Sequence, residues 1–177
     1  GNLQLNANAP SCSAGTLGNA SSAVTINDGN TGSSNTALLI GTSGVSVGRD
    51  ITVANSGSGT TTLGGTITSG TGSFTGGLAL NKSASLAADG TANITFSTGV
   101  ISGTGGLTKT GTGTVTLSGT NTFSGTTTVS QGTLQLNANA PSGANGTLGN
   151  ASSVVTINDA STGSNNTALL IGTSGVS

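Results

Sequence analysis

The stretch from Gly105 to Leu136 alternates between two kinds of residue, and this alternation constrains the fold more than any other feature of the chain. From Leu107 to Ser124 one parity carries apolar residues, glycines, Lys109 and Asn121, whereas the other parity is entirely threonine and serine. A period of two residues is typical of a β-strand with one covered face and one hydroxylated face. Glycines divide the stretch into short strands, and no 3.6-residue stripe indicates a helix. The sequence therefore predicts an all-β fold.

The spacing in this stretch resembles the autotransporter-associated β-strand repeat, also called the passenger-associated transport repeat. The residues that carry the resemblance are Gly105, Leu107, Lys109, Gly111, Gly113, Val115, Leu117, Gly119, Asn121, Phe123, Gly125, Thr127, Val129, Gly132 and Leu134. Family members often have Tyr at the position of Phe123 and Leu at that of Val115, and both exchanges keep a bulky apolar side chain. The resemblance covers residues 105–136. It implies a right-handed parallel β-helix in the passenger of a bacterial type V secreted protein.

An internal repeat supports a solenoid. Residues 1–46 recur as residues 132–177, an offset of 131, and the 46 aligned positions differ only at 2, 12, 13, 14, 23, 29, 30 and 34 of the first copy. Self-similarity at a fixed period is the signature of a stacked array. At roughly 22 residues per coil, 131 residues would make about six coils and the whole chain about eight. We expect residues 1–177 to form a single β-helical segment.

Each coil of such a solenoid is too thin to cover its own apolar face, so neighbouring coils must cover it. We expect the interior to contain Val115, Leu117, Phe123, Val129, Leu134 and Leu136. Candidate strands outside the alternating stretch include Leu78–Leu80 and Thr66–Thr68. Both chain ends fall within the repeat, which indicates either a window from a longer array or a unit that stacks end to end.

Charged residues make up only 4% of the chain and the formal net charge is -1. No basic patch is therefore available to bind nucleic acid or anionic lipid. The sequence shows neither a signal peptide nor an apolar run of the ~20 residues that a membrane span needs. We expect any contact with a membrane to be made by a translocator outside this chain. The resemblance implies an extracellular location or the bacterial outer surface.

The residues that could carry chemistry are few and scattered. The chain has no histidine, which excludes Ser–His and Cys–His nucleophiles. Its four acids are all aspartates, and Asp28 and Asp159 occupy the same repeat position several coils apart, where we expect Asx-type turns. A calcium site at Asp28 or Asp159 is a minor alternative, because one acid supplies too few oxygen ligands.

The remaining candidates favour structural roles. We expect Arg49 and Asp50 to lie at a solvated corner, and Lys109 to extend its ammonium group to solvent from a strand end. Cys12 aligns with Gly143, so the position does not require a thiol, and it cannot form an intrachain disulfide because it is the only cysteine. The sequence thus predicts no catalytic residue, no metal site and no cofactor, and a protein that is not an enzyme.

Three functions remain open. The first is a structural stalk or adhesin segment of an autotransporter-like passenger, with an uncharged surface that could contact other copies laterally or a host-surface ligand. The second is a subunit of an extracellular filament, in which terminal coils pair end to end through exposed strand edges. The third is an ice- or glycan-binding surface built on the threonines between Thr108 and Thr122.

Overall fold

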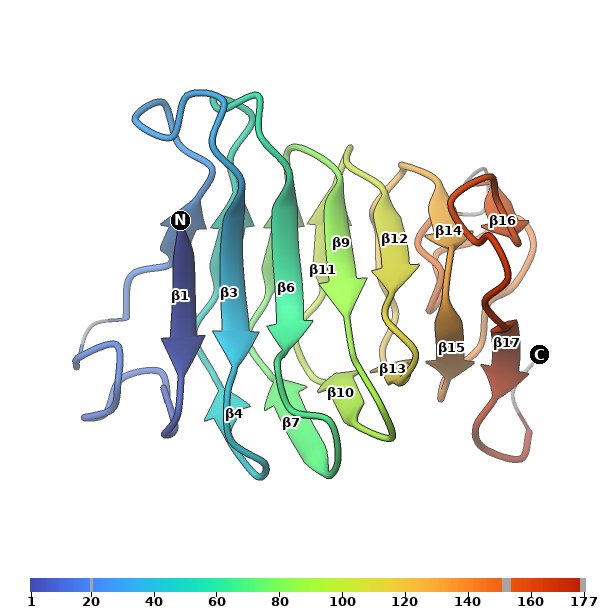
Figure 1. Ribbon diagram of the computed structural model, residues 1–177, viewed down its shortest axis with the longest axis horizontal. Helices are drawn as coiled ribbons and strands as arrows, with labels where there is room; N and C mark the ends of the chain where they lie inside the picture. Colours follow the sequence, from blue (N-terminus) through green and yellow to red (C-terminus); the bar gives the residue numbers. More distant parts are fainter. Residues whose placement is uncertain (20, 151–153, 176–177) are drawn as a thin grey trace.

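The computed structural model describes residues 1–19, 21–150 and 154–175, and they form a parallel β-solenoid (Figure 1). Three sheets, which we call A, B and C, run along the solenoid as its three sides, and every strand pair within them is parallel. The described residues contain no helix. The predicted all-β solenoid is therefore confirmed.

Sheet A holds seven strands in the order β1-β3-β6-β9-β12-β14-β16. Their bounds are Asn2–Leu5 (β1), Thr36–Ile40 (β3), Thr61–Gly65 (β6), Ala84–Ala87 (β9), Leu107–Thr110 (β12), Thr127–Val129 (β14) and Val155–Ile157 (β16). Successive strands are stacked one turn of the solenoid apart.

Sheets B and C complete each turn. Sheet B is formed by Ser46–Val47 (β4), Thr71–Phe74 (β7), Asn93–Phe96 (β10), Thr114–Leu117 (β13), Gly132–Leu136 (β15) and Thr167–Ile171 (β17). Sheet C is formed by Val24–Ile26 (β2), Ile51–Val53 (β5), Leu78–Leu80 (β8) and Ile101–Gly103 (β11). The chain runs from A to B to C and back to A, as β6, β7 and β8 illustrate.

In-register stacking builds the core. In sheet B, Val115 lies opposite Ile94 on one side and Leu134 on the other, and all three are at most 1% exposed. Phe74 and Phe96 stack on adjacent rungs with ring centroids 4.8 Å apart. The six residues predicted to lie inside are all buried, which confirms the prediction. Removing each large aliphatic side chain from water contributes about 1.5–3 kcal/mol, so the stack of coils is the source of stability.

The predicted count of about eight coils is wrong. Among the residues that the structure describes, no sheet has more than seven strands. Successive strands of sheet A begin 34, 25, 23, 23, 20 and 28 residues apart. The longest intervals contain long connections between strands, whose described residues are 6–19 and 21–23 (the first long loop) and 137–150 and 154 (the second long loop). These loops lengthen a coil without adding a rung.

The two copies of the repeat lie on different sides of the solenoid. β1 and β3 pair in sheet A, whereas their counterparts β15 and β17 pair in sheet B. Likewise β2 belongs to sheet C and its counterpart β16 to sheet A. From β1 the chain makes five turns to β14 and then one further side to β15. The repeat therefore advances by five turns and one side, not by the six whole coils expected.

Candidate functional surface

All three basic side chains bind carbonyl groups on a neighbouring coil, and Arg49 and Lys82 do so at corners of the solenoid. The guanidinium of Arg49 donates to the carbonyl of Leu17 over 3.1 Å. The ammonium of Lys82 donates to the carbonyls of Gly57 and Gly59 over 2.8 and 2.6 Å. Charge-assisted hydrogen bonds are the stronger ones in proteins. These cations therefore hold corners of one coil against the next.

Lys109 is placed differently from the sequence prediction. It stands opposite Leu86 and Val129 in an inward-facing column of sheet A and is 1% exposed. Its ammonium donates to the carbonyls of Thr110 and Gly111, both over 2.6 Å, and to a third carbonyl described below. The expectation that Lys109 reaches solvent is wrong, because these carbonyls satisfy the ammonium inside the solenoid.

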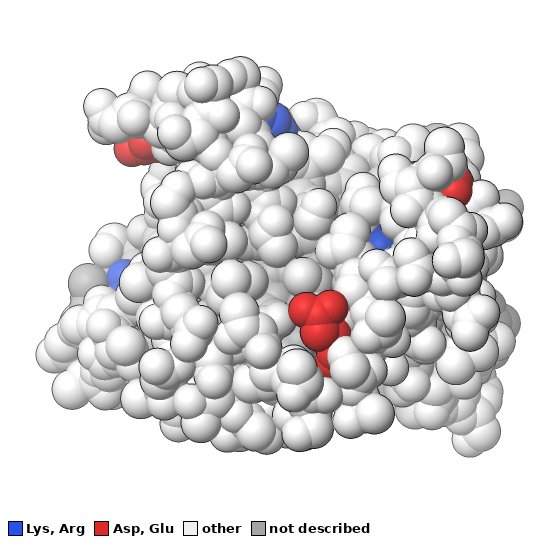
Figure 2. Space-filling view, viewed as in Figure 1, with Lys and Arg blue, Asp and Glu red and all other residues white. Residues whose placement is uncertain are grey.

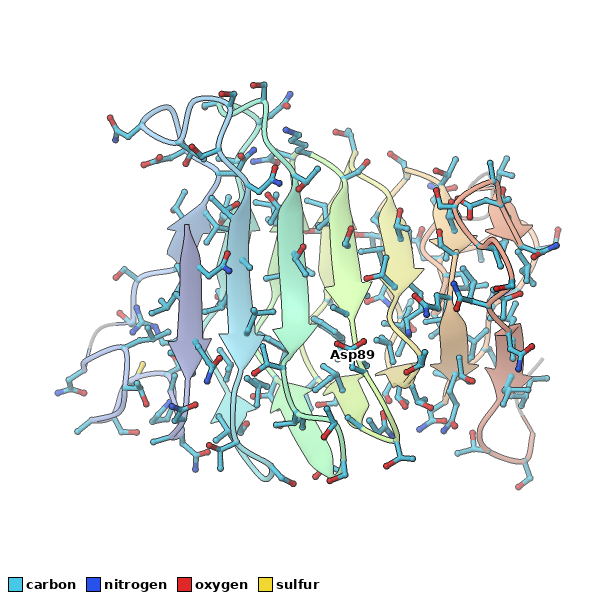
Figure 3. The ribbon with its side chains drawn as sticks, viewed as in Figure 1. Asp89 is labelled. Atoms are coloured by element: carbon cyan, nitrogen blue, oxygen red, sulfur yellow. The ribbon has the colours of Figure 1, made fainter. Side chains whose placement is uncertain are left out.

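Burial lowers the pKa of Lys109 from its ordinary 10.5 to about 8, and the carboxylate of Asp89 partly opposes this shift. Asp89 is exposed and lies in the segment that follows β9 (Figure 3). A lysine with a lowered pKa can act as a nucleophile or base. Here the ammonium is enclosed by backbone carbonyls, so the arrangement favours a structural role.

The Arg49–Asp50 corner is solvated only in part, so that prediction is corrected. Arg49 is buried, at 4% exposed, because it reaches back over the first long loop. Asp50 is exposed and accepts a hydrogen bond of 2.7 Å from the amide of Gly77 on the next coil. The two side chains therefore form hydrogen bonds with different coils, Arg49 with the first long loop and Asp50 with the coil that contains Gly77.

Asp28 and Asp159 form the predicted Asx-type turns. One carboxylate oxygen of Asp28 accepts from the amide of Asn30 over 3.1 Å. In the second copy the carboxylate of Asp159 accepts from the amide of Ser161 over 3.2 Å. These local hydrogen bonds give Asp28 and Asp159 a structural role in their turns.

Cys12 is exposed and free in the first long loop, with a positive φ of 60°. Its counterpart Gly143 also has a positive φ, of 86°. The described residues contain no group of three or more His, Cys, Asp or Glu that could hold a metal ion. Within the same part of the chain there is no helix long and apolar enough to cross a membrane.

Two buried asparagines were not anticipated from the sequence. Asn27, 1% exposed, donates to the carbonyls of Ala54 and Gly57 over 3.0 and 2.9 Å. Asn121, 2% exposed, accepts from the amide of Ile101 over 2.9 Å. The sequence signal that could have indicated a buried corner asparagine is an asparagine directly after an apolar strand, as in Thr25-Ile26-Asn27.

The outer faces of the sheets carry columns of small hydroxylated side chains. The longest column, in sheet A, comprises Thr62, Ser85, Thr108, Thr128 and Thr156. Two shorter columns in sheet B comprise Ser73, Thr95 and the buried Thr116, and Thr71, Thr114 and Thr133, with the amide side chain of Asn93 between Thr71 and Thr114. Charged atoms are few and scattered on the face shown in Figure 2. The outer surface is therefore largely neutral and polar.

The threonines between Thr108 and Thr122 do not form one row. Thr108 lies on β12 in sheet A, whereas Thr114 and Thr116 lie on β13 in sheet B. The stretch bends around the solenoid, so hydroxyl groups align between coils and not along the chain. Within sheet B, Thr116 also donates to the side-chain oxygen of Asn93 over 2.8 Å, which occupies that hydroxyl.

Apolar side chains are exposed at both ends of the described solenoid. Leu3 on β1 is 46% exposed, whereas its counterpart Leu134 is 1% exposed beneath β13. Ile171 on β17 is 63% exposed, whereas its counterpart Ile40 is fully buried beneath β6. In the described solenoid, each of these side chains thus lacks the neighbouring strand that covers its counterpart in the other copy.

Comparison with known proteins gives one match. Residues 107–136 match the Passenger-associated-transport-repeat family. No curated protein and no solved structure matches the chain. The matched residues are strands β12 to β15, which form part of an uninterrupted stack. The chain is thus a β-solenoid that carries a passenger-associated transport repeat in the coils from Leu107 to Leu136.

Proposed function

We propose that the chain is a non-catalytic stalk segment of a bacterial autotransporter-like passenger, which projects a more distal region from the cell surface. The observation that carries this proposal is the transport repeat at residues 107–136, built into the solenoid wall without a break in the strand stacking. A continuous stack of coils is stiff along its axis, because every coil packs against its neighbours. Such a segment needs no active site.

A display assay tests this proposal. The chain is fused to a bacterial outer-membrane translocator barrel, with an epitope at the N-terminus, and surface exposure is read by antibody binding to intact cells. We expect display of the epitope. Substituting Val115→Asp and Leu134→Asp in the transport repeat should abolish display, because unpaired charges would be buried in the stack. The outward substitutions Thr108→Asp and Thr128→Asp are the matched control and should preserve it. Equal display of both variants would contradict the proposal.

Self-association is a second candidate that one observation favours. The outward columns of hydroxyl groups are uncharged, so no electrostatic repulsion opposes contact between two such faces. Sedimentation velocity over a range of protein concentrations tests it. Lateral or end-to-end association predicts species heavier than the 16.5 kDa monomer at high concentration, and a single monomer peak throughout would exclude it.

The ice- and glycan-binding alternatives receive less support. All three phenylalanines are buried, at most 5% exposed, and the chain has no Trp or Tyr. No aromatic ring is therefore available to stack on a sugar. The threonines that suggested an ordered array are divided between two sheets. Assays for thermal hysteresis and for polysaccharide hydrolysis should both be negative.

A further inference from the structure

One large apolar side chain is exposed at a distance from both ends of the described solenoid. Val100, which directly precedes β11, is 48% exposed. The other exposed large apolar side chains in the described part of the chain lie on or beside the first or last strand of a sheet, and they are Leu3, Val154, Ile157, Leu170 and Ile171. Coils flank Val100 on both sides, because its carbonyl accepts from the amide of Leu78 and the carbonyl of Ile101 accepts from the amide of Thr122. Its exposure is therefore lateral, and coils stacked on either end would not cover it.

Val100 lines a cleft on the outer face of sheet C. The cleft has a volume of about 240 Å³ and spans three consecutive rungs, those of β5, β8 and β11. Two columns of outward residues line it, namely Asp50, Gly77 and Val100, and Thr52, Ala79 and Ser102. Because the middle rung contributes only glycine and alanine, the floor of the cleft is low, with an acidic wall on one side and an apolar wall on the other.

The middle of the cleft presents oxygen atoms to solvent. A Cβ atom on Gly77 would lie 3.4 Å from the carboxylate oxygen Oδ1 of Asp50 and 3.7 Å from the carbonyl oxygen of Val100. The amide of Gly77 holds Oδ1 in place over 2.7 Å, and no other hydrogen bond to this carboxylate is present among the described residues. The guanidinium of Arg49 is turned away, towards the carbonyls of Leu17 and Ser22. The recess over Gly77 therefore combines two acceptors with a negative charge that no described side chain pairs with.

A second copy of the chain cannot supply a basic side chain to this recess. The chain has three basic side chains. Arg49 is 4% exposed and Lys109 is 1% exposed, and Lys82 donates to the carbonyls of Gly57 and Gly59. All three are therefore engaged within their own chain. Charge complementarity consequently points to a partner of different sequence that carries its own cation.

We propose that this cleft binds the side chain of a lysine on a partner polypeptide. The ammonium lies over Gly77 and donates to Oδ1 of Asp50 and to the carbonyl oxygen of Val100, since each oxygen retains a lone pair. The aliphatic stem packs against the side chain of Val100, as lysine stems do on apolar surface. A compact ammonium suits a recess the width of one glycine better than a planar guanidinium does.

The second column of the cleft suits the backbone of the same partner. The hydroxyls of Thr52 and Ser102 form no hydrogen bond with another described residue, so they can donate to or accept from the peptide groups beside the lysine. This site goes beyond the stalk function, since it gives the side of the stalk a partner selected by charge.

Titration of the isotope-labelled full chain with Nα-acetyl-lysine N-methylamide, followed by amide chemical shifts at low ionic strength, tests the proposal. We expect saturable shifts at Gly77, Ala79 and Val100, with a dissociation constant in the millimolar range because an exposed ion pair contributes little. Shifts around Asp89, another exposed acid, should be small, which separates binding in the cleft from general pairing with cations. The corresponding norleucine compound, which lacks the ammonium, should not bind detectably. n-Butylammonium, which lacks the backbone, should bind more weakly.

Three variants complete the test. Asp50→Asn keeps an acceptor for the amide of Gly77 but removes the charge, and it should weaken binding of the lysine compound by about threefold or more. Val100→Ser should also weaken binding, because the stem loses its apolar contact. Asp89→Asn is the matched control and should leave the affinity unchanged. Circular dichroism verifies that each variant is folded.

Four results would overturn the proposal: shifts that do not saturate, equal shifts around Gly77 and Asp89, unchanged affinity in Asp50→Asn, or n-butylammonium binding as tightly as the lysine compound. The last result would assign the cleft to free amines and not to a polypeptide. Because none of these measurements involves a translocator, failure here is distinct from failure of the stalk proposal.

Discussion

Lys109 joins two coils through the backbone of Gln131: its ammonium donates to the Gln131 carbonyl over 3.0 Å. The two residues are 22 positions apart and belong to successive turns. The amides of Ser130 and Gln131 in turn donate to the carbonyl of Lys109. The lysine of the transport repeat is therefore an internal connection between coils, and not part of the surface.

Replacing Lys109 by methionine should destabilise the solenoid. The methionine side chain suits the column between Leu86 and Val129, but it removes the ammonium donor from three part-buried carbonyls, of which that of Thr110 keeps the amide of Ala88 as a donor. We expect the free energy of unfolding to fall by about 2–4 kcal/mol, measured by urea denaturation followed by circular dichroism. Thr108→Met, on the outer face of the same strand, is the control and should change stability by less than about 0.5 kcal/mol. Equal effects of the two substitutions would contradict the role assigned to Lys109.

The lowered pKa of Lys109 predicts how stability depends on pH. Unfolding returns this pKa from about 8 towards 10.5, so between these values the unfolded chain binds more protons than the folded chain. The free energy of unfolding should therefore rise as pH increases from 8 to 10.5, and the contribution of Lys109 should be constant below that window. Denaturation midpoints of the wild-type chain and of Lys109→Met, compared across this range, isolate the contribution because every other ionisable group is shared. A difference between them that does not change with pH would contradict the prediction.

The sequence predicted the interior far better than the corners. Val115, Leu117 and Phe123 are buried as expected, because alternation with period two fixes which face a side chain takes. Thr66–Thr68 was expected to be a strand, but the chain turns there, and the amide of Thr66 donates to Ile40 on the neighbouring rung.

Strands of small residues were missed, as β7 and β9 show. Their sequences, TGSF and ASLA, carry little intrinsic strand preference, and only the neighbouring rungs make them strands. Lys109 has the parity of the inward-facing residues, but its ammonium was expected to reach solvent, because its carbonyl partners depend on corners that local sequence does not specify. The same holds for Arg49, whose acceptor at Leu17 lies 32 residues away.

Gly64 tests how closely adjacent rungs approach. It has φ of 153°, and a Cβ atom there would lie 2.0 Å from the carbonyl oxygen of Ala87 on the next rung. Gly64→Ala should therefore lower the free energy of unfolding by more than about 3 kcal/mol or prevent folding. Thermal and urea unfolding measure the first outcome, and loss of the β-sheet circular dichroism signal reports the second.

The chain itself provides the control for this substitution. Gly29 has only the Cβ of Ser56 within reach, at 3.9 Å, and its counterpart in the second copy is already alanine, Ala160. Gly29→Ala should leave stability within about 0.5 kcal/mol of the wild type. Similar losses for both variants would mean that rung spacing does not limit position 64.

The placement of the two copies on different sides can be measured directly with spin labels. Cys12 and its counterpart Gly143 share a positive φ and an exposed loop, so Gly143→Cys creates an equivalent pair of labelling sites. Five turns and one side correspond to an axial rise of about 26 Å at ~4.8 Å per turn. Because the loops leave different sides, the distance between labels should exceed this rise clearly.

The control pair Thr62→Cys and Thr156→Cys, in a Cys12→Ser background, lies in one column four turns apart and should give about 19 Å plus the label offset. A distance between positions 12 and 143 equal to the axial rise alone would place both loops on the same side and contradict the phase shift.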